Sequence, residues 1–265
     1  MNAKLEMVSP LPERVVVTGT ASGLGKSIAA ALLECGCDVI GLDLAPQPPE
    51  LRNNRYRHLQ GDVSTEALWA QVAELARTGD PDRLGLVCAA AVLKVGTILE
   101  TEQADIDLTM NVNFKGTALA FRTMIPIMRK HGGGPLVAVA SVDATFAEQQ
   151  LSVYAASKGA VRMLTRTVAM DHAREGIRAN VLSPGPMMAG LFERHMQSAN
   201  DPGLFLATRA ARQPGGRILD PSEIAQAALF LLSDASSALN GAEIIADGGL
   251  TTSFDFRTGA EGASV

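Results

Sequence analysis

The stretch Arg14–Gly25, RVVVTGTASGLG, decides the fold of this 265-residue chain. Its first five residues are mostly β-branched and are followed by glycine, as in a buried strand. A helical pattern then runs from Leu24 to Cys35. Glycines let a phosphate approach the backbone, and the N-terminus of the next helix supplies free N–H groups. The stretch therefore predicts a site for a dinucleotide phosphate, although its spacing, G-x-x-x-G-x-G, differs from the commonest fingerprint.

A second strand, at residues 38–42, ends at Asp43. Asp43 follows Gly19 by close to the ~20 residues that separate such glycines from an acidic ligand of the adenosine ribose. A carboxylate there accepts from the 2′-hydroxyl and repels a 2′-phosphate. Neither the turn after Gly19 nor the two residues after Asp43 offer a cation. NAD is therefore favoured over NADP, with a plain strand-end aspartate as the alternative.

A third stretch, from Ser141 to Lys158, follows the apolar run at residues 136–140. Tyr154 and Lys158 are four residues apart and share one face of a helix. Ser141 lies at the carboxyl end of a predicted strand, where ligands of open α/β sheets bind. Together the three side chains can move a proton to or from an alcohol oxygen. Alone, Tyr-x-x-x-Lys is also compatible with a surface tyrosine beside a lysine.

Strands and helices alternate along the chain, which predicts a single α/β domain with a doubly wound parallel sheet. The domain spans residues 14–250, between an N-terminal tail at 1–13 and a C-terminal tail at 251–265. An apolar insertion at about 186–215 is either a lid over the substrate or a helix pair packed on the body.

A long helix is predicted from residue 102 to 130, with a kink at Pro126. Asn111 and Asn113 lie in its interior, where asparagine is a poor helix former. An interior asparagine marks either a local distortion or a satisfied polar contact.

Composition excludes several classes of function. The net charge is −5, without a long basic run, so nucleic acid is not an expected partner. The three cysteines show neither metal-ligand nor disulfide spacing, and we expect no metal. No apolar run reaches the ~18 residues of a membrane span, and the N-terminus lacks a secretory signal. We therefore expect a cytoplasmic protein with a small-molecule substrate and no membrane partner.

Further motifs appear in a fixed order: Thr18-Gly19-x-x-x-Gly23-x-Gly25, Asp62-Val63, Asn113-Phe114-Lys115-Gly116, Ser141, Tyr154-x-x-x-Lys158, Pro184-Gly185, Arg217 and Asp247-Gly248-Gly249. From Arg14 to Leu250 the chain thus resembles the short-chain dehydrogenase/reductase family. The resemblance implies a Rossmann-type fold and a nicotinamide cofactor. It also implies a homodimer or homotetramer, paired through the helices that carry Asn113 and Tyr154.

The resemblance implies four catalytic residues, Asn113, Ser141, Tyr154 and Lys158. Tyr154 is then the base in alcohol oxidation and the acid in ketone reduction. Its ordinary pKa of ~10 is too high for that role, so Lys158 and the positive nicotinamide are expected to lower it. Ser141 polarises the substrate oxygen, and Lys158 also holds the ribose. Asn113, preferred to Asn111 by its motif, binds a water that links Lys158 to solvent.

The cofactor-binding residues predicted from the turn, the acidic residue and the resemblance are Gly19, Ser22, Gly23, Leu24, Gly25, Asp43, Asp62, Val63, Tyr154, Lys158, Pro184, Gly185 and Met187.

Three departures from the family pattern stand out. The segment Cys88–Ala91 replaces the usual Asn-Asn-Ala-Gly, and the lost amides are expected to weaken a structural network. Ala189 stands where the family often has a threonine that binds the nicotinamide carboxamide. The carboxamide is therefore expected to be held by the Met187 backbone. Asp143 stands where small residues are usual. It either accepts a hydrogen bond from a second substrate hydroxyl or an amine, or it points to solvent.

These features predict an NAD-dependent alcohol dehydrogenase or ketone reductase. Its substrate is a mainly apolar secondary alcohol or ketone, with cyclic and aromatic ones among the candidates. Two alternatives stay open: an NADP(H)-dependent ketone reductase, and a non-catalytic nucleotide sensor or scaffold on the same fold. Specificity is expected in three segments, at residues 93–97, 143–151 and 186–215.

Overall fold

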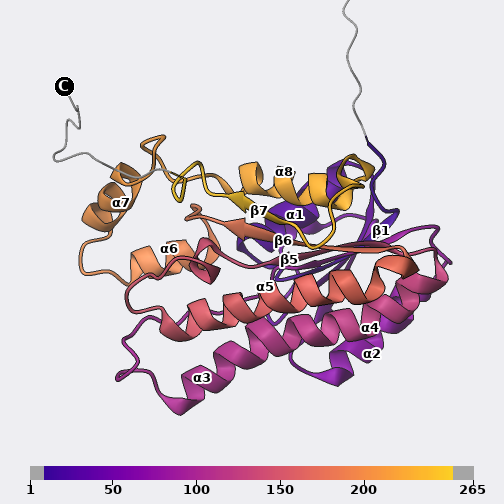
Figure 1. Ribbon diagram of the computed structural model, residues 1–265, viewed down its shortest axis with the longest axis horizontal. Coiled ribbons are helices and arrows are strands. Elements are labelled where there is room, and N and C mark those ends of the chain that lie inside the picture. Colours follow the sequence, from indigo (N-terminus) through magenta and orange to yellow (C-terminus); the bar gives the residue numbers. More distant parts are fainter. Residues whose placement is uncertain (1–8, 253–265) are drawn as a thin grey trace, which may run out of the picture.

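A parallel sheet of seven strands runs through the middle of the protein, whose computed structural model describes residues 9–252 (Figure 1). The strands are β1 Arg14–Thr18, β2 Asp38–Asp43, β3 Tyr56–Gln60, β4 Leu84–Cys88, β5 Gly134–Val139, β6 Ile177–Pro184 and β7 Glu243–Ala246. Their order across the sheet is β3-β2-β1-β4-β5-β6-β7. The order reverses direction between β1 and β4, which is where such sheets bind ligands. The predicted doubly wound, Rossmann-type fold is confirmed.

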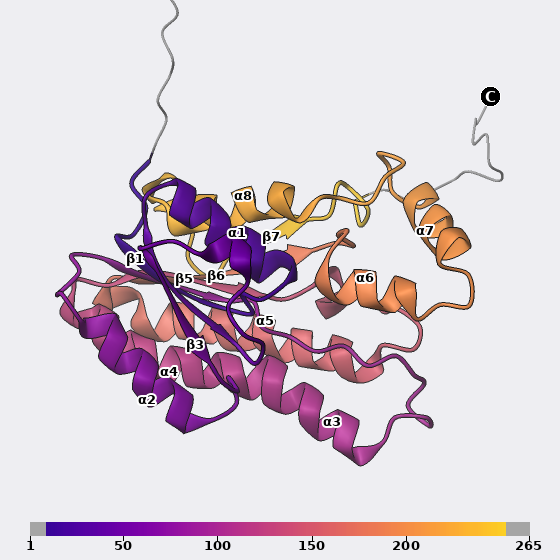
Figure 2. The ribbon, with the colours of Figure 1, turned by 180° about the vertical axis from the view of Figure 1, so that it is seen from behind.

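Helices cover both faces of the sheet (Figures 1 and 2). They are α1 Gly23–Glu34, α2 Glu66–Arg77, α3 Gln103–Thr109, α4 Gly116–Lys130, α5 Ser152–His172, α6 Gly190–Gln197, α7 Pro202–Ala211 and α8 Pro221–Leu232. α1 and α8 lie on one face, and α2, α4 and α5 on the other. Side chains along β1 alternate between the two cores, because successive residues of a strand point to opposite faces. Within residues 9–252, no helix is both long and apolar enough to cross a membrane.

The helix predicted for residues 102–130 is interrupted. A π-helical turn, Met110–Lys115, separates α3 from α4. The prediction of one continuous α-helix was therefore wrong at this turn, while the expectation that an interior asparagine marks a local distortion is confirmed by Asn113. Such π turns occur often at functional sites.

The insertion at 186–215 forms a helix pair, α6 and α7, at one end of the molecule (orange in Figures 1 and 2). The rings of Phe192 and Phe205 join the two helices, with their centroids 5.7 Å apart. The first residue of α6, Gly190, meets the first residue of α1, since a Cβ added to Gly23 would lie 3.4 Å from the Gly190 Cα. The insertion therefore lies over the start of α1.

The packed body begins ahead of β1, since Leu11 contacts the core and Pro12 is buried. The predicted tails at 1–13 and 251–265 otherwise fall mostly outside the described residues.

Trp69 in α2 provides a test of the core. It is 2% exposed, and its Nε1 donates a hydrogen bond of 2.8 Å to the carbonyl oxygen of Val63. In Trp69→Phe that buried carbonyl loses its donor and a void opens, so we expect the free energy of unfolding to fall by about 2 kcal/mol. Urea denaturation measures the change. Gln71→Ala, an exposed change on the same helix, should stay within about 0.5 kcal/mol of the parent. Equal midpoints for Trp69→Phe and the parent would contradict the assigned role.

Candidate active site

A cavity of about 1190 Å³ runs along the carboxyl ends of the strands. It is lined by every predicted cofactor residue: Gly19, Ser22, Gly23, Leu24, Gly25, Asp43, Asp62, Val63, Tyr154, Lys158, Pro184, Gly185 and Met187. Ser141 also lines it, whereas Asn113 lies behind the wall. The sheet thus brings together residues from strand ends far apart in the sequence.

The glycine turn packs against the first turn of α1 without room for side chains. A Cβ on Gly25 would lie 2.2 Å from the carbonyl oxygen of Gly19. A Cβ on Gly19, whose φ is +78°, would lie 2.9 Å from the backbone of Ala90. Because the turn exposes backbone and a helix N-terminus to the cavity, it fits the pyrophosphate of a dinucleotide.

Asp43 ends β2 beside this turn. Its Oδ2 accepts a hydrogen bond of 2.9 Å from the Ala21 N–H, and its Oδ1 accepts one of 3.0 Å from the Ala45 N–H. A carboxylate has about four acceptor positions, so capacity remains for the hydroxyls of a ribose. The residues present therefore fit the adenosine end of a dinucleotide.

The segment after β4 keeps its backbone hydrogen bonds despite the loss of the family's amides. The Thr18 Oγ1 accepts from the N–H groups of Ala89 and Ala90, at 3.0 and 2.9 Å. The Asn113 Oδ1 accepts from the Val92 N–H at 2.8 Å. The expected weakening of the network is therefore not seen in these contacts. Burial raises the pKa of Cys88 to about 12, so its thiol stays neutral.

Asn113 connects this segment to the helix that carries Tyr154. Its Nδ2 donates to the carbonyl of Val92 at 3.0 Å and to the hydroxyl of Ser157 at 2.9 Å. Ser157 in turn donates to the backbone carbonyl of Tyr154 at 2.7 Å. The Asn113 side chain thus positions two walls of the cavity. Ser157 was not singled out from the sequence, and its burial beside the asparagine is what identifies it.

Tyr154 and Lys158 lie on the cavity face of α5, 8% and 2% exposed. The Lys158 Nζ lies 5.7 Å from the centroid of the Tyr154 ring and donates a hydrogen bond of 2.8 Å to the carbonyl of Val139. Burial lowers the pKa of Lys158 to about 8. Burial, followed by the charge of Asp143, raises the pKa of Tyr154 well above its ordinary value. Lys158 does not bring about the expected lowering in the protein alone, because desolvation disfavours the phenolate more strongly.

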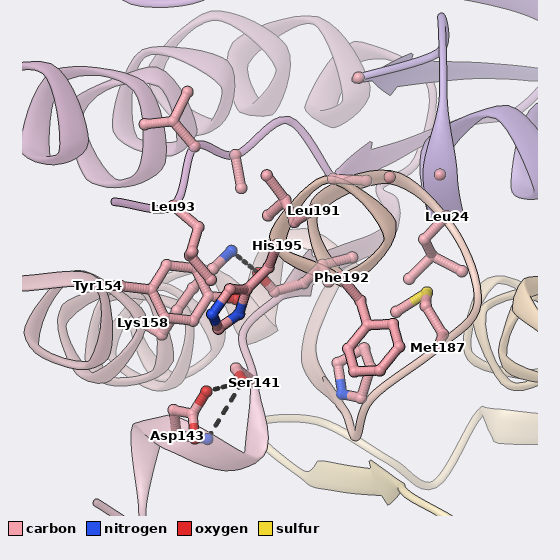
Figure 3. Close-up of a pocket in the computed structure, with 18 of the residues that line it drawn as sticks. Leu24, Leu93, Ser141, Asp143, Tyr154, Lys158, Met187, Leu191, Phe192 and His195 are labelled. Carbon is pink, nitrogen blue, oxygen red and sulfur yellow. Dashed lines mark hydrogen bonds between the residues drawn. The ribbon is translucent and has the colours of Figure 1, made fainter. Parts of the chain in front are cut away.

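Ser141 and Asp143 form a closed pair beside Tyr154 (Figure 3). The Ser141 hydroxyl donates to the Asp143 Oδ2 at 3.1 Å and accepts from the Asp143 N–H at 3.1 Å. Of the two positions considered for Asp143, the structure therefore shows the one inside the cavity. Burial, and next the charge of Glu148, raise the pKa of Asp143 to about 6.

An ion pair between Arg209 and Glu148 spans the cavity from α7 to the loop before α5. The Arg209 guanidinium also stacks on the Phe205 ring, 5.1 Å from its centroid. His195 lies beside the same ring, and burial lowers its pKa. These residues fall in the segments expected to set specificity. Their contacts with one another could not be predicted, because the partners are far apart in the sequence.

The remaining wall is mainly apolar and includes Val92, Leu93, Val142, Phe146, Leu151, Met187, Leu191 and Phe192. Within the described part of the chain, no group of three histidine, cysteine or acidic side chains is arranged to hold a metal ion.

Comparisons with known proteins agree with this fold. A family model described as enoyl-(acyl carrier protein) reductase matches residues 19–251. Cis-4-hydroxycyclohexanecarboxylate dehydrogenase of Sinomonas cyclohexanicum is 35% identical over 251 residues, which are 90% of this chain and 97% of the relative. Dehydrogenase/reductase SDR family member 6 of Xenopus laevis is 32% identical over 238 residues, 89% of this chain and 96% of the relative.

Among solved structures, that of levodione reductase superposes with a TM-score of 0.85 at 28% identity, covering 91% of this chain and 98% of the other. The matches span nearly the whole described domain, including the cavity. The chain therefore belongs to the short-chain dehydrogenase/reductase family, oxidoreductases that use a nicotinamide cofactor to act on alcohols and ketones.

Proposed function

We propose that the protein transfers a hydride between NAD and a mainly apolar secondary alcohol or ketone, with Tyr154 as the general acid and base. The observation that carries this proposal is the convergence of Ser141, Tyr154 and Lys158 on the cavity that also holds the glycine turn. Cyclic and aromatic alcohols are included, because leucine, phenylalanine and methionine side chains form the apolar wall.

The cofactor would lie along the cavity, with its pyrophosphate on the Gly19–Gly25 turn and its adenosine near Asp43, Asp62 and Val63. Pro184, Gly185 and the Met187 backbone line the nicotinamide end. When bound, the nicotinamide supplies the hydride acceptor in alcohol oxidation.

In oxidation Tyr154 takes the proton of the alcohol oxygen, and in reduction it returns one. Its burial stabilises the neutral phenol, so a phenolate requires positive charge close to the ring. Lys158 is the cation that the protein itself provides, 5.7 Å from the ring centroid. Lys158 also lines the cavity where the ribose is expected. Asn113 acts by positioning the backbone of Val92 and α5, and its predicted water remains a proposal.

NAD is the proposed cofactor because the Asp43 carboxylate lines the end of the cavity where the adenosine ribose is expected. Leu44 and Ala45, the residues after it, line the same end of the cavity without positive charge. The 2′-phosphate of NADP would be repelled by the Asp43 carboxylate, and neither Leu44 nor Ala45 would offset that repulsion with a positive charge.

A cyclic secondary alcohol is supported by the relative whose name specifies cis-4-hydroxycyclohexanecarboxylate as its substrate. That name describes a hydroxyl on a saturated ring. Leu93, Leu151, Leu191 and Phe192 line the cavity with apolar side chains that such a ring would contact.

We also infer a homodimer or homotetramer. α5, the helix that carries Tyr154, exposes two large apolar side chains, Met163 at 56% and Met170 at 78%. Ile245 on the edge strand β7 is 49% exposed. Pairing of these surfaces would remove apolar area from water. A cytoplasmic location is proposed with it, because Cys35, Cys37 and Cys88 are all free thiols.

Removal of the Tyr154 hydroxyl tests the proton transfer. In Tyr154→Phe we expect kcat to fall at least ~10²-fold with NAD binding retained, because the ring stays and only the acid–base group is lost. NADH absorbance with a panel of secondary alcohols measures kcat. Tyr56→Phe, a change at the chain's other tyrosine, should keep kcat within a few-fold. A near-normal kcat in Tyr154→Phe would refute the role of Tyr154 as the general acid and base. NAD binding without turnover of any alcohol or ketone would favour the non-catalytic alternative.

Cofactor titration tests the role of Asp43. The parent should bind NADH more tightly than NADPH, and Asp43→Ser should reduce that preference at least ~10-fold, a change of about 1.4 kcal/mol. Fluorescence titration gives both dissociation constants. Leu44→Ala, a neutral change at the next residue, should leave the ratio as it is. Tighter binding of NADPH by the parent would refute the assignment.

Sedimentation velocity at micromolar concentration tests the assembly. We expect a species larger than the 27.8 kDa chain. Met170→Glu should shift the protein towards monomer, because a charge on the paired face would lose its hydration. Leu99→Glu serves as the control, since Leu99 is a 95% exposed loop residue. A parent that sediments only as monomer would overturn the inference.

A further inference from the structure

Asp143 places a carboxylate in the wall of the cavity, directly beside Ser141 (Figure 3). Its Oδ2 accepts the Ser141 hydroxyl proton at 3.1 Å, while its backbone N–H donates to the same serine oxygen at 3.1 Å. Among the described residues, no other side chain or backbone group donates a hydrogen bond to either carboxylate oxygen. The serine is thus the donor that stabilises this carboxylate.

The serine hydroxyl has one proton to donate. In the proposed reaction Ser141 polarises the substrate oxygen by donating a hydrogen bond to it, and this requires the proton that Ser141 now donates to Asp143. When the hydroxyl turns to the substrate, the Asp143 Oδ2 loses its partner. A half-buried carboxylate without a donor is unfavourable, so productive binding is penalised unless a new donor arrives.

The groups around Asp143 do not supply that donor. Glu148, from the loop before α5, is a second carboxylate and repels Asp143. Arg209 of α7 is engaged with Glu148 and acts on Asp143 only through space. Tyr154 of α5 lies on the same side, and its hydroxyl is assigned to the reacting oxygen. His195 of α6 lies close to the Arg209–Glu148 pair, where burial lowers its pKa, and it makes no hydrogen bond to Asp143.

We propose that the substrate itself supplies the missing donor, and that Asp143 binds a second hydroxyl on the carbon next to the reacting one. The inference rests on the proposed alcohol–ketone chemistry and narrows its substrate class to apolar molecules that carry a vicinal diol or an α-hydroxy ketone. The neighbouring carbon is chosen because Asp143 and the serine that holds the reacting oxygen are only 3.1 Å apart.

A hydroxyl is favoured over an ammonium group at this position. Asp143 is half-buried in a cavity whose wall is mainly apolar. Burying a charged ammonium there costs more than burying a neutral hydroxyl, which also donates to the carboxylate.

Two probes that differ by one hydroxyl test the proposal, cyclohexanol and cyclohexane-1,2-diol. With NAD and the full chain, we expect kcat/KM for the preferred diol isomer to exceed that for cyclohexanol at least ~10-fold, because the monoalcohol leaves the carboxylate unpaired. This comparison in the parent needs no variant. Equal values, or a preference for cyclohexanol, would overturn the proposal.

Asp143→Leu should abolish the diol preference, since the apolar side chain requires no donor. Gln149→Ala, a change at an exposed, uncharged residue that lines the same cavity, should retain it. Circular dichroism and NAD binding report whether each variant is folded. Retention of the preference in folded Asp143→Leu would contradict recognition by Asp143. Faster oxidation of 2-aminocyclohexanol than of the diol would contradict the choice of a hydroxyl.

A binding measurement separates this proposal from the proposed function. In Tyr154→Phe loaded with NAD, NMR line broadening should show tighter binding of the diol than of cyclohexanol. If the parent oxidises neither probe but this binding preference is present and is lost on adding Asp143→Leu, the proposed oxidation fails and the role of Asp143 stands. If both probes bind equally, the role of Asp143 fails whatever the turnover.

Discussion

The close approach of α1 to the end of β1 is the constraint on which the site depends. A single methyl group at Gly25 would lie 2.2 Å from the carbonyl oxygen of Gly19, so the two backbones touch directly. Gly19 in turn contacts the backbone of Ala90, which is held by the hydroxyl of Thr18. These contacts fix the ends of β1, β4 and α1 relative to one another. The floor of the cavity is therefore made of backbone, which leaves room for a ligand to lie flat against it.

Burial dominates the electrostatics of the other wall. It favours the neutral form of both Tyr154 and Lys158, raising the pKa of the phenol and lowering that of the ammonium to about 8. Neither group is poised for proton transfer by its neighbour alone. A positive charge that enters with the oxidised cofactor would lower the pKa of both groups, which favours the phenolate and the neutral amine. In the proposed mechanism, proton transfer is thus coupled to the redox state of the bound nicotinamide.

Local patterns and the family resemblance were enough to predict residues that line the cavity, because strand ends and glycine turns are encoded over short stretches. The alternation of strands and helices was enough to predict a doubly wound parallel sheet, whereas the order of its strands came from the structure. Three features of the cavity could not be predicted from local sequence and became visible only in the tertiary structure. The Arg209–Glu148 pair joins residues 61 apart in the sequence. The orientation of Asp143 is seen only in its hydrogen bonds with Ser141, and the support of Cys88–Ala91 comes from Thr18 on a neighbouring strand. The hydroxyl of Thr18 at a strand end was the one signal available for the last of these.

The hydrogen bond between Trp69 and Val63 has an optical consequence. Trp69 is the only tryptophan in the sequence, so the tryptophan fluorescence of the protein arises from one buried indole. Its N–H is bonded to the carbonyl of Val63, which itself lines the cavity. A ligand that displaces Val63 changes the polarity felt by the excited indole, and a reduced nicotinamide in the cavity absorbs the light that a buried tryptophan emits. The fold thus contains its own spectroscopic probe of occupancy, with no label to attach.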